Sequence, residues 1–67
     1  MRNKVRELRK NQKLTQEELA MLIGISRQAI NAIEKEKFDP SLPTAFKMAT
    51  LFKTSIEDLF IYKIKKN

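Results

Sequence analysis

The stretch Thr15–Lys37, TQEELAMLIGISRQAINAIEKEK, carries start and stop signals for two short helices joined by a tight turn. Thr15 is a favourable N-cap residue, and Glu18 three positions later completes a capping box. Gly24 is the only glycine in the chain, and it can end the first helix in the left-handed conformation. Ser26 can cap the second helix. The spacing therefore predicts a helix-turn-helix.

The second helix, predicted over 27–35, has two chemically different faces. At about 100° per residue, Ile30, Ile33 and Glu34 fall together on one face. The other face carries a guanidinium, two amides, a methyl and an ammonium, from Arg27, Gln28, Asn31, Ala32 and Lys35. Amides can bond adenine, a guanidinium can bond guanine, and a methyl can contact thymine. This composition favours reading of base edges over an ordinary solvated face, which would be richer in Glu and Lys.

The same residues resemble the helix-turn-helix of the phage-repressor/Cro-type (XRE-like) family of bacterial DNA-binding regulators. The resemblance rests on Thr15–Ala20, Gly24, Ser26–Gln28, Ile30, Ile33–Glu34, Pro40–Leu42 and Ile56–Phe60. It implies one all-α domain over 1–67, with five helices and a helix-turn-helix at about 15–35. It also implies a transcriptional regulator that binds double-stranded DNA in a sequence-specific manner and acts as a homodimeric repressor on a palindromic operator.

The resemblance also assigns roles to individual side chains. It implies base contacts from the outer face of the second helix, by Arg27, Gln28, Asn31 and Ala32. It implies phosphate contacts from the ends of that helix and from its neighbours, by Gln16, Ser26, Lys35 and Lys37. In the family, an arginine at the place of Arg9 pairs with the glutamate that is Glu34 here. A phosphate contact is the alternative role for Arg9, and the structural pair is favoured because Glu34 falls on the inward face.

Three further helices are predicted, over 3–11, from a cap at Ser41 to about Phe52, and from a cap at Ser55. The longest of them should place an apolar stripe in the core, made by Leu42, Ala45, Phe46, Met48, Ala49 and Phe52. We expect Met21 and Leu22 at the edge of the core and Phe38 as a plug beneath a loop.

The tail after Leu59 changes from a helical to an alternating pattern, since Tyr62 and Ile64 alternate with lysines. It is either a short strand, which needs a partner, or disordered beyond Tyr62. The partner is either the segment near Met1–Asn3 or the tail of a second chain. The tail exceeds what a small core can cover, which predicts a homodimer interface at Phe60, Ile61, Tyr62 and Ile64.

Composition limits the possible functions. The 67 residues carry a net charge of +6, concentrated at the two ends: +5 over 1–13, −2 over 14–60 and +3 over 61–67. A basic chain is compatible with nucleic acid, and equally with simple solubilisation. Without His or Cys, and without a glycine-rich loop, we expect neither an enzyme nor a metal or other cofactor.

The sequence has no apolar run long enough for a membrane helix or a signal peptide, so we expect a cytoplasmic protein associated with the bacterial nucleoid. An alternative function stays open. The basic, partly apolar tail is also compatible with an antitoxin-like or adaptor protein whose main role is to bind a partner protein. RNA binding is disfavoured because the aromatic residues are spaced as core rather than as stacking platforms.

Overall fold

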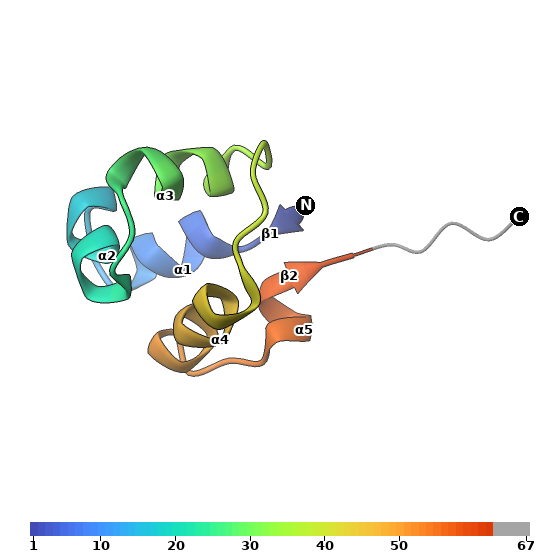
Figure 1. Ribbon diagram of the computed structural model, residues 1–67. Coiled ribbons are helices and arrows are strands. Elements are labelled where there is room, and N and C mark those ends of the chain that lie inside the picture. The colour runs from blue at the N-terminus through green and yellow to red at the C-terminus, as the bar shows by residue number, and fades with distance from the viewer. Residues whose placement is uncertain (63–67) are drawn as a thin grey trace, which may run out of the picture.

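The computed structural model describes residues 1–62 and contains five helices and one two-stranded sheet (Figure 1). The elements follow in the order β1 (Arg2–Asn3), α1 (Val5–Asn11), α2 (Gln16–Ile23), α3 (Arg27–Glu34), α4 (Leu42–Leu51), α5 (Ile56–Leu59) and β2 (Phe60–Ile61). Helices α2 and α3 pack against each other as the helix-turn-helix, and α4 lies on the opposite side of the molecule from α3 (Figure 1). The predicted five-helix fold is thereby confirmed.

Each of the four later helices begins at a side-chain cap that the sequence predicted. The Thr15 hydroxyl accepts a hydrogen bond from the Glu18 backbone N–H at 3.0 Å, and the Thr15 N–H donates to Glu18 Oε1 at 2.8 Å. These two bonds satisfy amides that a helix start leaves without partners. They also hold the pKa of the Glu18 carboxyl below its ordinary value of 4.5, chiefly through the bond from the Thr15 backbone. Single serine caps start the others, at Ser26, Ser41 and Ser55.

The ends of the helices are less visible in the sequence. Gly24 ends α2 with φ of 88°, as expected. Three other helices are followed by residues in the same left-handed region, namely Lys13, Glu36 and Lys53, with φ between 55° and 62°. In each case the next N–H returns to a carbonyl five residues back, as Leu14 does to Arg9 at 3.1 Å. One backbone device thus ends α1, α2, α3 and α4, although only one of the four carries a glycine.

The sheet joins the two ends of the described chain. Strand β1 pairs antiparallel with β2, with Arg2 opposite Ile61 and Asn3 opposite Phe60. The predicted strand is therefore real, but it lies earlier than the alternating residues, and its partner is the N-terminal segment of the same chain. The first helix begins at Val5 rather than Asn3 because Asn3 belongs to β1.

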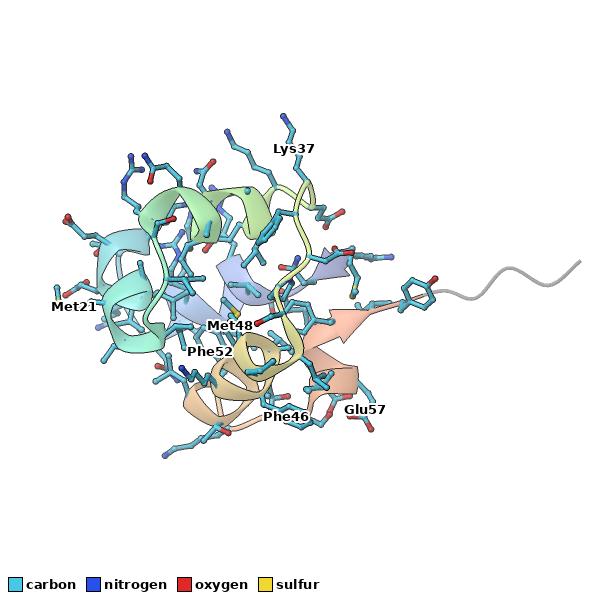
Figure 2. The ribbon with its side chains drawn as sticks, in the orientation of Figure 1. Met21, Lys37, Phe46, Met48, Phe52 and Glu57 are labelled. Atoms are coloured by element: carbon cyan, nitrogen blue, oxygen red, sulfur yellow. The ribbon has the colours of Figure 1, made fainter. Side chains whose placement is uncertain are left out.

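The core lies between the helices and contains twelve apolar side chains. They are Val5, Leu19, Ala20, Ile23, Ile30, Ile33, Ala45, Met48, Ala49, Phe52, Leu59 and Phe60. Figure 2 shows Met48 and Phe52 pointing inward from α4. Several predicted core positions are wrong: Leu42, Phe46, Met21, Leu22 and Phe38 are all more than half exposed. The apolar stripe of α4 is wider than the face that α2 and α5 can cover.

Candidate nucleic-acid interface

Helix α3 divides into an inward and an outward face as its sequence predicts. Ile30 and Ile33 are fully buried, and the Glu34 side chain is only 3% exposed. Arg27 and Gln28 at the start of the helix are exposed, and so is Lys35 directly after its end. Because the inward side chains fix the rotation of the helix, they also decide which side chains project outward. The guanidinium and the first amide therefore lie on an accessible ridge.

The start of α3 is set by the turn before it. Gly24 ends α2, Ile25 is half-buried against the core, and the Ser26 hydroxyl accepts from the Ala29 N–H at 3.0 Å. A hydroxyl that accepts a cap bond keeps its own proton to donate to an acceptor such as a phosphate oxygen. The turn therefore delivers Arg27 and Gln28 at the first turn of the helix, beside Ser26.

A chain of polar contacts connects the outer face of α3 to the interior. Arg9 of α1 donates from Nε to Glu34 Oε2 at 2.7 Å and from Nη2 to Glu34 Oε1 at 3.2 Å. Gln16 Nε2 donates to the same carboxylate at 3.0 Å, and Asn31 Nδ2 donates to Gln16 Oε1 at 3.4 Å. The predicted Arg9–Glu34 pair is thus present. Two residues assigned to DNA contacts, Gln16 and Asn31, are held in place by it.

This polar chain lines a hollow of about 300 Å³ between α1, α2 and α3. Its lining residues are Arg6, Arg9, Gln16, Asn31, Glu34 and Lys35. Arg6 is the one member with no role in the sequence-based assignment. It stands one helical turn before Arg9, and that spacing was the only available signal for it. The hollow combines cations with amides, which is the chemistry that holds a phosphate oxygen.

The remaining assigned residues on this side are Ala32 and Lys37. Ala32 is half-buried, so only part of its methyl faces outward. Lys37 lies in the loop after α3, and Figure 2 shows its side chain projecting beyond that end of the helix. Phe38 beside it is 52% exposed and is not the predicted plug. Arg27, Gln28, Lys35 and Lys37 together place four exposed cations and amides along one side of the molecule.

The residues assigned to a dimer interface have different surroundings. Phe60 is 6% exposed and belongs to the core of its own subunit, so its assignment as an interface residue is wrong. Strand β2 reverses the backbone after α5 and turns this ring inward. Ile61 is half-buried, Tyr62 is 74% exposed, and Ile64 lies outside the described residues. A mostly apolar hollow of about 220 Å³ involves both chain ends, lined by Met1, Pro40, Leu42, Ala45, Ile56 and Phe60.

Two residues outside the sequence-based assignments hold this region together. Asn3 Nδ2 donates to the Ile33 carbonyl at 2.9 Å, which fixes the end of α3 to β1. The terminal ammonium of Met1 lies 3.0 Å from Asp39 Oδ1. Over residues 1–62, none of the helices has the length and apolar character needed to cross a membrane.

Comparison with known proteins identifies relatives of the whole fold. A family model described as helix-turn-helix matches residues 5–59. The chain is 56% identical over 63 residues to an uncharacterized HTH-type transcriptional regulator of Methanocaldococcus jannaschii, covering 94% of this chain and 96% of that protein. It is 43% identical over 60 residues to the uncharacterized HTH-type transcriptional regulator YgzD of Bacillus subtilis, covering 90% and 91%. The relatives thus include both archaeal and bacterial proteins.

A solved structure extends the likeness to three dimensions. The crystal structure of the restriction-modification controller protein C.AhdI from Aeromonas hydrophila matches with a TM-score of 0.75 and 35% sequence identity. The match covers 85% of this chain and 86% of that chain.

Proposed function

Since the chain belongs to the phage-repressor/Cro-type helix-turn-helix family of DNA-binding transcriptional regulators, we propose that it is a homodimeric repressor that reads a palindromic operator with α3. The observation that supports this proposal best is the division of α3 into two faces. Ile30, Ile33 and Glu34 are turned inward, which leaves Arg27 and Gln28 accessible at the start of the helix. In helix-turn-helix proteins, these first positions of the second helix contact base edges in the major groove.

Base recognition falls to the outer side of α3. Arg27 bonds guanine and Gln28 bonds adenine, each through two parallel hydrogen bonds. Asn31 and the Ala32 methyl contact the next base pairs, with the Asn31 amide oriented by Gln16. Since Asn31 and Ala32 are half-buried, they contribute less to recognition than the two exposed side chains before them.

Phosphate contacts position α3 in the groove without reading sequence. The start of α2 presents backbone N–H groups and the positive end of a helix dipole, beside the Gln16 side chain. Ser26 supplies its hydroxyl proton, and Lys35 and Lys37 supply ammonium groups beyond the end of α3. Arg6 joins these residues because it lines the same polar hollow.

Dimerisation is proposed at the side of the molecule where β1 and β2 meet. Tyr62 is exposed there, Ile61 is half-buried, and the Met1–Leu42 hollow beside them is mostly apolar. One α3 reads only a few base pairs, whereas two copies about 34 Å apart read both halves of a palindrome on one face of the duplex. Binding such a site represses by occupying it.

In-vitro selection of bound duplexes from a random pool tests this function. We expect an enriched motif of two inverted half-sites whose centres lie about 10 base pairs apart. A pool that shows no enriched sequence after selection would remove sequence recognition from the account. A single, unrepeated half-site would leave recognition in place and remove the homodimer.

A further inference from the structure

Helix α4 carries an exposed aromatic ring on the side of the molecule that faces away from α3. Phe46 is 56% exposed, although phenylalanine is among the residue types most often buried. Figure 2 shows Phe46 and Lys37 at opposite ends of the molecule. Contiguous exposed apolar surface on a small protein marks a site of association. The ring is therefore available for contact while the α3 side is occupied by DNA.

Two apolar hollows border the Phe46 ring, one on each side of α4. The first has a volume of about 540 Å³ and lies between α2 and α4, lined by Leu22, Ile23, Phe46, Lys47, Thr50 and Leu51. The second has a volume of about 560 Å³ and lies between α4 and α5, with Leu42, Phe46, Thr50, Ile56 and Glu57 among its lining residues. We call the surface formed by Phe46 and these two hollows the Phe46 face.

The charges on the Phe46 face are arranged as a complementary pair. Lys47 is the only charged residue that lines the first hollow, and Glu57 is the only one that lines the second. A foreign acidic segment laid across both hollows would meet Glu57, and a basic one would meet Lys47. A second copy of the same surface satisfies both hollows at once if its α2 side lies over the α5 side of the first copy.

We propose that the Phe46 face binds the Phe46 face of a second copy about a two-fold axis that runs along α4. This symmetry operation places each first hollow over the second hollow of the other copy. The two Phe46 rings pack side by side across the axis, each over a hollow of the other subunit. Each Lys47 ammonium then faces the Glu57 carboxylate of the partner subunit. The interface has the usual form of an aromatic centre with a charged rim.

This association is separate from the dimer proposed at β1 and β2. The Phe46 face points away from α3, so two copies joined through it expose their α3 helices on opposite sides. Such a pair cannot place both α3 helices on one face of a straight duplex. Used together, the two interfaces form a tetramer that joins two DNA-bound dimers back to back and bridges two DNA segments.

Sedimentation velocity of the DNA-free protein over a concentration series tests the Phe46 interface. The comparison is made in the full chain carrying Tyr62→Asp, which disables the other proposed interface. We expect this protein to dimerise, and Phe46→Glu to weaken its dimerisation at least tenfold. Met21→Glu is the matched control, because Met21 is 79% exposed but lines neither hollow, and it should leave dimerisation unchanged.

A charge exchange tests the predicted pairing between subunits. Lys47→Glu and Glu57→Lys should each weaken dimerisation, and the double variant should restore it toward the level of the Tyr62→Asp protein. A double variant no better than its singles, or Phe46→Glu without effect, would overturn the proposal. Because no DNA is present, this result is independent of whether α3 reads an operator. Capture of a foreign protein through Phe46 without self-association would also overturn it.

Discussion

The Arg9 guanidinium holds the Glu34 carboxylate through two hydrogen bonds, of 2.7 and 3.2 Å, and thereby joins α1 to the recognition helix α3. Both side chains are nearly out of contact with water, with exposed fractions of 10% and 3%. Arg9 also donates from Nη1 to the Leu14 carbonyl at 2.8 Å. The pair fixes the rotation of α3, and it does so one helical turn from the residues that project outward.

Glu34→Ala should destabilise the fold by about 3 kcal/mol, since the change leaves a buried guanidinium without its charge partner. Urea denaturation followed by circular dichroism measures the loss. The double variant Arg9→Met/Glu34→Ala is the control, and it should be more stable than Glu34→Ala alone because it buries no unpaired charge. A loss below about 1 kcal/mol for Glu34→Ala would show that the pair does not order α3.

Gly24→Ala should cost about 1 kcal/mol through the backbone alone, because an added Cβ at this position meets no atom within 4 Å while φ is +88°. Thermal unfolding measures the change. Gly24→Asn provides the comparison, since asparagine adopts the left-handed region more readily and should lose less. Equal stability of all three proteins would mean that the turn adopts another conformation.

The Glu18 carboxylate should make stability depend on pH below about 4.5. Its pKa is lowered in the folded state, so the unfolded chain takes up the proton first as pH falls. The contribution is complete above the unfolded pKa and is lost as pH falls through the folded one. Glu18→Gln keeps an acceptor oxygen for the capping box but does not titrate. The difference in urea midpoint between wild type and Glu18→Gln should therefore shrink on acidification, and a difference independent of pH would contradict the capping contact.

Lys37→Ala should weaken binding to every DNA sequence by a similar factor and reduce the slope of log K against log salt by about one unit. The reason is that a phosphate contact releases a counterion but carries no sequence information. Fluorescence anisotropy at several salt concentrations gives the slope. Lys53→Ala, on the loop after α4, is the matched control and should leave the slope unchanged. A Lys37→Ala protein that loses affinity for only one sequence would have lost a base contact instead.

The helix starts and the two faces of α3 were predictable because their signals are local. Thr15, Ser26, Ser41 and Ser55 each cap the helix that follows them. The period of α3 separates Ile30 and Ile33 from the outer side chains without ambiguity, since its outer face carries only one small apolar residue, Ala32.

The exposed apolar residues were not predictable from the same pattern. In α4, most of the ten residues LPTAFKMATL are apolar, so the period cannot tell which side is covered. The structure buries Met48 and leaves Phe46 exposed, because coverage depends on where α2 and α5 pack. Likewise, the pairing of β1 with β2 joins residues nearly sixty positions apart, and neither two-residue strand has a pattern of its own. The polar hollow containing Arg6 forms only when three helices meet.

The central claim is that the outer side of α3 reads base edges, and Gln28→Ala tests it most directly. Competition between a selected operator and a scrambled duplex should show that this variant loses about tenfold or more of its sequence preference, the loss expected for one bidentate contact. Its circular dichroism and unfolding midpoint should match wild type, because Gln28 is exposed. A Gln28→Ala protein whose preference for the operator stays within about twofold of wild type would contradict the account.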